Sequence, residues 1–161
     1  MSAETAARIA AFLDTHHVMS LATSGPEGPH AANLFYARDG FALFWVSDPQ
    51  SRHSAELEAD PHVAATVAPD YRDFAEICGV QISGEAHRLR SAAQCGRARA
   101  LLEARYPFLH RMPNRSDVKQ AYASAEFYRL VPRTLVLIDN RRGFGHKETL
   151  DVVLSDAERM P

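Results

Sequence analysis

The chain has 161 residues, with 18 Lys or Arg against 20 Asp or Glu and a formal net charge of -2. This length suits one domain with a substantial core, and the charge offers no basic field for a polyanion, so we expect no nucleic-acid partner. The two cysteines lack metal-site spacing, and no segment reads as a secretion signal or a membrane span, so we expect reduced thiols, a cytoplasmic location and no membrane partner.

The first third of the chain predicts a helix followed by strands. Ser2 is a candidate N-cap, and the apolar residues after it fall at helical spacing: Ala6, Ile9, Ala10, Phe12 and Leu13. Strand-like segments follow at 18–23, 30–38 and 41–47. The dipeptide Asp39-Gly40 between the last two is a hairpin signal, because a tight turn needs positive φ. These segments predict three antiparallel strands.

The rest of the chain adds more strands than helices. We expect short helices in 51–61 and 91–107, and strands in 62–68, 75–89, 126–132 and 134–140, with a Gly-rich turn in 141–150. Gly79 and Gly84 suggest that the long strand is bent. Strands in hairpin order and in this number are typical of a small closed antiparallel barrel, which would also remove exposed edges.

A candidate anion site lies where the third strand leads into the next helix. Ser47 ends the strand, and Ser51, Arg52 and His53 begin the helix. Free amides at a helix N-terminus, serine hydroxyls and a guanidinium group together suit a phosphate group. An ordinary helix cap beside a solvated arginine would give the same pattern, so these residues alone leave both interpretations open.

Several motifs keep a fixed order from about His17 to Lys147. They are Ala32-Asn33-Leu34-Phe35-Tyr36, Ser51-Arg52-His53, Gly79-Val80-Gln81 with Gly84-Glu85 and Arg88-Leu89, and Asn140 with Gly143-Phe144-Gly145 and Lys147. Together with the strand 40–47, which leads into Ser51-Arg52-His53, these motifs resemble the pyridoxamine 5'-phosphate oxidase-like superfamily of split barrels that bind flavin mononucleotide (FMN). The likeness is greatest to a small branch of that superfamily.

The resemblance implies a single FMN-binding split-barrel domain over residues 1–161, mainly β with peripheral helices, that forms a homodimer with the flavin at its interface. It places Val46 and Ser47 beside the flavin ring and ribityl chain, and Arg52 and His53 at the phosphate. The cofactor-binding residues that it implies are Asn33, Phe35, Val46, Ser47, Ser51, Arg52, His53, Gln81, Phe144 and Lys147.

The chain also departs from the oxidase. His53 stands where the oxidase has Lys, Asn33 and Tyr36 lie where it has an Arg and a Lys, and its C-terminal Trp and Arg have no counterpart. We therefore expect a flavin-dependent oxidoreductase of a different small-molecule substrate. No acid or base stands out, so no catalytic residue is predicted.

Other functions stay open at this point. The eight histidines are dispersed, so we expect no metal site. A haem-binding or haem-degrading protein on the same barrel, with His146 as a possible axial ligand, is the first alternative. A non-catalytic flavin carrier is the second. The sequence does not distinguish FMN from a deazaflavin.

Overall fold

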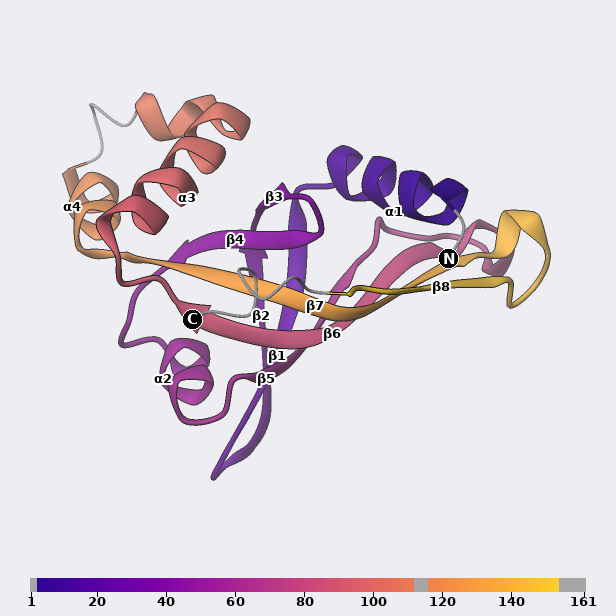
Figure 1. Cartoon of the computed structure of the whole chain (residues 1–161), viewed down its shortest axis with the longest axis horizontal. Coiled ribbons are helices and arrows are strands. Elements are labelled where there is room, and N and C mark those ends of the chain that lie inside the picture. Colours follow the sequence, from indigo (N-terminus) through magenta and orange to yellow (C-terminus); the bar gives the residue numbers. More distant parts are fainter. Residues whose placement is uncertain (1–2, 112–115, 154–161) are drawn as a thin grey trace.

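The structure is a computed structural model that describes residues 3–111 and 116–153. In this part of the chain a curved antiparallel sheet forms the centre, with helices around it (Figure 1). The strands are β1 (Val18–Gly25), β2 (Gly28–Phe35), β3 (Ala37–Asp39), β4 (Ala42–Ser47), β5 (His62–Val67), β6 (Cys78–Arg88), β7 (Glu126–Asp139) and β8 (Lys147–Asp151). The helices are α1 (Ala3–Thr15), α2 (Arg52–Ala59), α3 (Ala92–Arg105) and α4 (Ser116–Ser124), with short 3-10 turns η1 (Phe74–Glu76), η2 (Pro107–His110) and η3 (Asn140–Arg142). The predicted antiparallel split barrel with peripheral helices is confirmed.

β7 is the strand at which the barrel splits. One edge of β7 pairs with β6 along nearly its whole length. Its other edge pairs with β4 over residues 126–130 and with β8 over residues 134–138. From β6 the sheet continues through β5 and β1 to β2, and β3 pairs with β4. The sheet therefore ends at β2 and β3, and the fully closed barrel suggested by the number of strands is wrong.

The bend in β6 and β7 depends on a glycine and a proline that face each other. Gly84 is paired with Pro132, and the register of the two strands shifts between Ser83 and Gly84. A Cβ atom on Gly84 would lie 2.2 Å from the carbonyl oxygen of Val131, so only glycine fits there. Proline lacks an amide hydrogen and is tolerated where a bulge interrupts the ladder. The predicted division of 126–140 into two strands is thus wrong, because one strand crosses Pro132.

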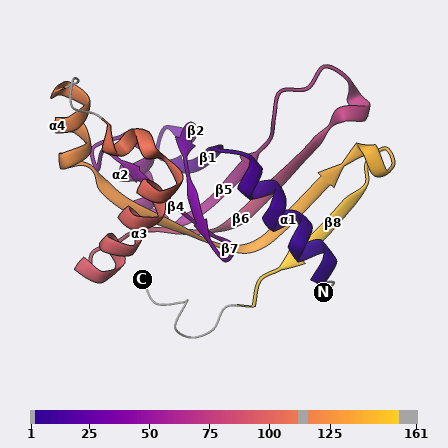
Figure 2. The same ribbon diagram turned by 90° about the horizontal axis from the view of Figure 1, so that it is seen from above.

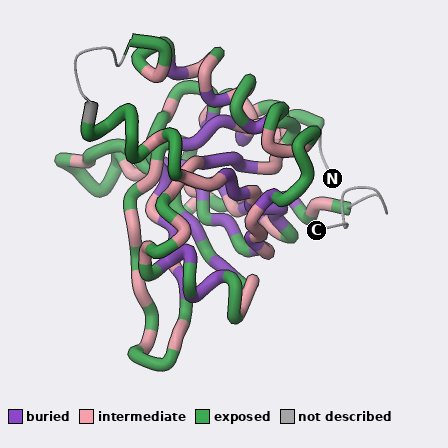
Figure 3. The backbone as a smooth tube through the Cα atoms, turned by 90° about the vertical axis from the view of Figure 1, so that its left-hand side faces the viewer, coloured by how far each residue is buried: buried purple, intermediate pink, exposed green. Residues whose placement is uncertain are grey.

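Two hydrophobic clusters pack against the sheet, and the buried residues gather in the interior of the molecule (Figure 3). Along β4, Leu43 and Trp45 point into the first cluster, inside the curved sheet, where α1 contributes Ile9 and Leu13. Phe44 belongs to the second cluster, between β4 and α3. Because side chains alternate along a strand, β4 contributes residues to both hydrophobic clusters, one on each of its faces. Figure 2 shows α1 along the β6 and β8 side of the sheet and α3 on the β4 side.

Several local predictions can be compared with these elements. The hairpin at Asp39-Gly40 is confirmed, with Gly40 at φ 58°. The predicted N-cap Ser2 lies outside the described residues. Helix α4 and strand β8 were not predicted. Within residues 3–111 and 116–153, no helix is long and apolar enough to cross a membrane.

Candidate functional site

The end of β4 and the start of α2 bring together three of the predicted site residues. Ser47 Oγ lies 2.7 Å from His53 Nε2, and Ser51 Oγ lies 3.1 Å from the same nitrogen. We call Ser47, Ser51 and His53 the serine–histidine cluster. His53 is only 8% exposed although it lies in the first turn of a surface helix. The predicted meeting of a strand end and a helix start is therefore present, with two hydroxyl groups directed at one imidazole.

The surroundings of His53 disfavour its charged form. Burial lowers the pKa of His53 below its usual value, and the neighbouring His30 imidazole lowers this pKa further. The two rings are nearly parallel, with their centroids 6.4 Å apart. His53 is therefore neutral at neutral pH in the free protein, and a nearby anion would favour its protonation.

Ser51 precedes α2 without capping it through its side chain. Its hydroxyl group lies 2.8 Å from the Asp48 carbonyl oxygen and 2.8 Å from Ser54 Oγ. The first-turn amides of α2 thus donate no hydrogen bond to the side chain of this serine. Amides of this kind at a helix start are suited to an anion.

Arg52 is fixed by a neighbouring carboxylate. Its Nε donates a hydrogen bond to Glu56 Oε1 at 2.7 Å, and its Nη2 donates to the carbonyl oxygen of Gly28 at 3.2 Å. The other oxygen of Glu56 accepts a hydrogen bond of 2.6 Å from Thr23 Oγ1. The bonds from Thr23 and Arg52 lower the pKa of Glu56. Arg52 and Glu56 tie α2 to the β1–β2 hairpin. Among the described residues, Arg52 Nη1 forms an ion pair of 3.8 Å with the exposed Glu27.

Asn33 and Phe35 lie on the exposed face of β2, apart from the serine–histidine cluster. Asn33 Oδ1 accepts a hydrogen bond of 2.6 Å from Ser20 on β1. Phe35 is 53% exposed, and its ring lies 5.3 Å from that of Tyr106 and 5.7 Å from that of Phe108. These three rings form a small aromatic cluster that connects β2 with η2.

Gln81, Phe144 and Lys147 lie elsewhere in the chain. Gln81 is exposed on β6, and two strands, β1 and β5, separate it from β2. Phe144, 85% exposed, lies in the turn between β7 and β8, and Lys147 begins β8. In Figure 1 that turn is at the opposite end of the sheet from α2. Within the chain itself, these three residues therefore do not join the serine–histidine cluster.

His146, the possible haem ligand, has a local partner. Its Nε2 lies 3.0 Å from Glu148 Oε1, which also pairs with Arg8 at 2.7 Å. The bonds from Arg8 and His146 lower the pKa of Glu148 to about 2. The His146 nitrogen is therefore engaged in an ion-pair network. In the described part of the chain, no three His, Cys, Asp or Glu side chains gather as a metal site would require.

Val46 lies on the other face of β4 from Ser47 and lines an apolar hollow of about 580 Å³. We call this hollow the α4 pocket. Its apolar walls come from Val46, Phe108, Leu109, Val118, Ala121 and Tyr122. Ser47 and Val46 thus divide the strand end into a polar side next to α2 and an apolar side next to α4.

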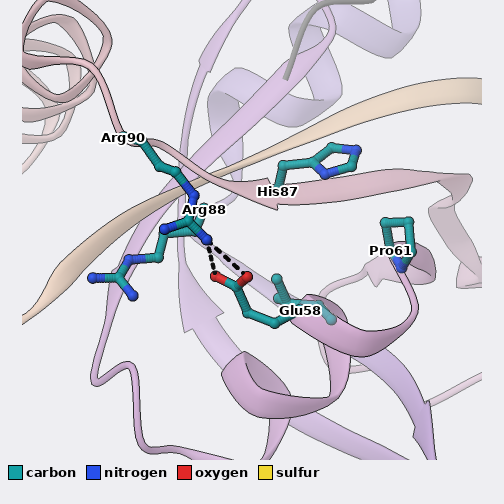
Figure 4. A pocket seen from close by; sticks show the side chains of 6 residues that line it. Glu58, Pro61, His87, Arg88 and Arg90 are labelled. Carbon is teal, nitrogen blue, oxygen red and sulfur yellow. Dashed lines mark hydrogen bonds and ion pairs between the residues drawn. The ribbon is translucent and has the colours of Figure 1, made fainter.

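A second hollow, of about 350 Å³, lies at the other end of α2 (Figure 4). Two arginines line it, but both have carboxylate partners. Arg90 Nη2 lies 3.0 Å from Glu58 Oε2, and Arg88 Nη2 lies 2.7 Å from Glu126 Oε1. An anion here would have to compete with these carboxylates, so the start of α2 is the better candidate for a phosphate group.

Sequence reasoning missed His30, Thr23 and Glu56. His30 alternates with the exposed residues of β2, so its inward direction could have been read from the period of the strand. Glu56 follows Arg52 by four residues, a spacing that permits an ion pair on a helix. Nothing in the sequence indicated that Thr23, on another strand, bonds the same carboxylate.

Comparisons with known proteins agree with this architecture. The family model described as pyridoxamine 5'-phosphate oxidase matches residues 5–129. A UPF0306 protein of Photorhabdus laumondii is 30% identical over 138 residues, which cover 84% of this chain and 88% of that protein.

Two solved structures show the same fold. A heme binding protein from Mycobacterium smegmatis has a TM-score of 0.72 at 19% identity and covers 94% of this chain and 59% of that one. A FAD-binding protein from Mesorhizobium loti has a TM-score of 0.63 at 17% identity and covers 84% of this chain and 92% of that one. By the family match and the 30% identity, the chain belongs to the pyridoxamine 5'-phosphate oxidase family, and within it to the UPF0306 proteins.

Proposed function

We propose that this protein binds FMN and is a flavin-dependent oxidoreductase of a small-molecule substrate. The observation that carries the proposal is the serine–histidine cluster at the start of α2, in a chain whose family includes flavin oxidases. A bound flavin would supply the redox chemistry, and the protein would supply binding and orientation.

The residues present fit a phosphate group. The uncapped amides of α2, the hydroxyl groups of Ser47 and Ser51, and Arg52 Nη1 are donors on adjoining segments. His53 would gain a proton as the phosphate approaches, which would partly replace the Lys of the oxidase. The Glu56 carboxylate fixes Arg52 and also neutralises part of its charge, so we expect this phosphate grip to be weaker than that of a free arginine.

We further propose that the protein is a homodimer that forms through the outer face of strands β2, β1, β5 and β6. Strand register places two rows of uncharged side chains there, all exposed or partly exposed: Asn33, Ser20, Thr66 and Gln81 in one, and Ala31, Ala22, Ala64 and Ser83 in the other. We call these eight residues the outer sheet face. Charged residues are depleted at interface cores, and a two-fold axis would pair this face with the same face of a second copy.

A cytoplasmic location and the absence of a nucleic-acid partner belong to the same proposal. Both described cysteines, Cys78 and Cys95, are free thiols, which supports a reducing compartment. The net charge of -2 gives no general attraction to a polyanion.

An absorption spectrum of protein purified without added cofactor tests the proposed cofactor. We expect the two visible and near-ultraviolet bands of oxidised flavin, and their release on denaturation. A Soret band would instead support the haem alternative. If the purified protein shows neither flavin bands nor a Soret band, titration with FMN, riboflavin and haemin identifies the ligand that it binds. Failure of FMN to bind at micromolar concentration would overturn the proposal. Reduction of the bound flavin by NADH or NADPH, followed by reoxidation with an added acceptor, separates an oxidoreductase from a carrier.

A further inference from the structure

The α4 pocket has the size and shape of a small-molecule site. Its volume of about 580 Å³ lies within the roughly 300–1,000 Å³ common for ligand pockets. Three segments line it: the end of β4, the η2 turn, and α4. No sequence pattern indicated this pocket, because α4 was not predicted.

Helix α4 presents one face to this pocket. Val118, Ala121 and Tyr122 line it, at positions i, i+3 and i+4, and Ala125, directly after the helix, lines it too. Tyr122 also anchors the helix on α3, since its hydroxyl group donates to Glu103 Oε1 at 3.3 Å and the Arg99 guanidinium lies 5.3 Å from its ring centre. The apolar face of α4 therefore faces the pocket that it lines together with β4 and η2.

The aromatic ring of Phe108 forms one side of the pocket. Phe108 lines it and is 49% exposed, and its ring lies 5.7 Å from Phe35 and 5.7 Å from Tyr106. Tyr106 is buried, and neither it nor Phe35 lines the pocket, so Phe108 and Tyr122 are its aromatic lining residues. A flat ring would find an aromatic partner there.

The charges of the pocket lie at its exposed parts and have opposite signs. Asp48 and Arg111 are both exposed lining residues. Together they add no net charge, and the remaining surface is largely apolar. The pocket therefore favours an uncharged ligand over an organic acid or a cation.

The pocket is next to the proposed flavin site. Val46 lines it, and Ser47, the following residue, contacts His53. Phe35, another residue that the family resemblance places at the cofactor, touches Phe108. We propose that the α4 pocket is the substrate site and takes an uncharged, planar, largely apolar molecule, an assignment that rests on the proposed flavin binding.

The first test uses the full chain and the neutral, apolar aromatic probe N-phenyl-1-naphthylamine, whose fluorescence rises in apolar sites. Ala121→Trp fills the pocket and should lower probe affinity roughly tenfold or more. Ala123→Trp is the matched control, because Ala123 is exposed on the same helix and does not line the pocket. Affinity that is equal in the wild type and Ala121→Trp, or lost equally in both variants, would overturn the pocket assignment.

The second test asks whether the pocket adjoins the flavin. Emission of the probe overlaps flavin absorption, so a probe bound beside FMN should be strongly quenched in the FMN-loaded protein and not in the FMN-free protein. Bound probe that stays bright in the loaded protein would overturn the substrate-site role. FMN affinity, measured separately in all three proteins, should be unchanged. If the wild-type protein does not bind FMN, the proposed function itself fails. The probe titration of the first test does not depend on FMN, so the two failures can be distinguished.

Discussion

Replacing Arg52 with Ala should weaken FMN binding about tenfold and leave riboflavin within about a few fold. Riboflavin lacks the phosphate group, so a phosphate contact is lost only for FMN. Arg52 begins α2, and the first-turn amides of this helix have no side-chain cap from Ser51.

The size of the effect follows from the hydrogen bonds of Arg52. A charge-assisted contact with all donors available corresponds to about one to two decades in affinity. Here Nε is bonded to Glu56 and one Nη2 hydrogen to the Gly28 carbonyl group, while Nη1 pairs with the exposed Glu27 at 3.8 Å. We therefore expect the lower end of that range. Glu56→Gln, which removes the competing charge but keeps a hydrogen-bond acceptor, should tighten FMN and not riboflavin.

The assay is fluorescence titration of both flavins against the wild type and the variants, with circular dichroism to compare secondary structure. Arg97→Ala is a suitable control, because Arg97 is an exposed arginine on α3 that pairs with Asp39. Equal losses for FMN and riboflavin would place the damage in the ring site or the fold. If neither affinity changes, Arg52 serves only to hold α2 on the β1–β2 hairpin, and the phosphate argument fails.

Three further predictions concern pH, assembly and the fold. Because FMN phosphate should raise the lowered pKa of His53, FMN affinity should increase as pH falls from about 8 to about 6, less so in His53→Gln, whereas riboflavin affinity should not. Sedimentation equilibrium at micromolar concentration should show a dimer for the wild type and for Ala123→Arg, but a monomer for Ala64→Arg on the outer sheet face. Urea unfolding should show that Gly84→Ala lowers the free energy of unfolding by about 1–3 kcal/mol or more.

Each of these has an outcome that contradicts it. Identical pH profiles for wild type and His53→Gln would remove His53 from the phosphate site. A monomeric wild type, or a dimer that survives Ala64→Arg, would exclude that face as the interface. Gly96→Ala is the control for Gly84→Ala, since nothing lies within 4 Å of a Cβ at this helical position, and it should be neutral or stabilising. Equal stability of the two variants would mean that the sheet relaxes around Gly84 without loss.

The parts of the site that could be predicted are those encoded within a few residues. Ser47, Ser51 and His53 meet because a short turn joins the end of β4 to α2, and serine, arginine and histidine at that turn are visible in the sequence. The contact of Phe35 with Phe108 joins residues far apart in the sequence, so no local pattern indicates it. A single chain also does not show which residues the proposed second copy would contribute to the site.

The errors in the fold have a similar cause. Pro132 suggested a break because proline normally ends a strand, and only the facing Gly84 makes the crossing possible. Helix α4 has a polar composition, and its apolar residues make sense as a face only once β4 and η2 lie opposite them. The core alternation of β4 was clear in advance, since Leu43 and Trp45 fall on one side and Phe44 on the other.

The sharing of one edge of β7 by β4 and β8 limits how the chain can change in length. A residue deleted between Pro132 and Leu135 would leave the β4 half of the strand in place. The same deletion would turn every side chain of the β8 half to the opposite face, and move buried Leu135 and Leu137 to the outside. Insertions and deletions should therefore be tolerated in the β1–β2 and β7–β8 turns but not within β7, where one lost residue would separate the two halves of the barrel.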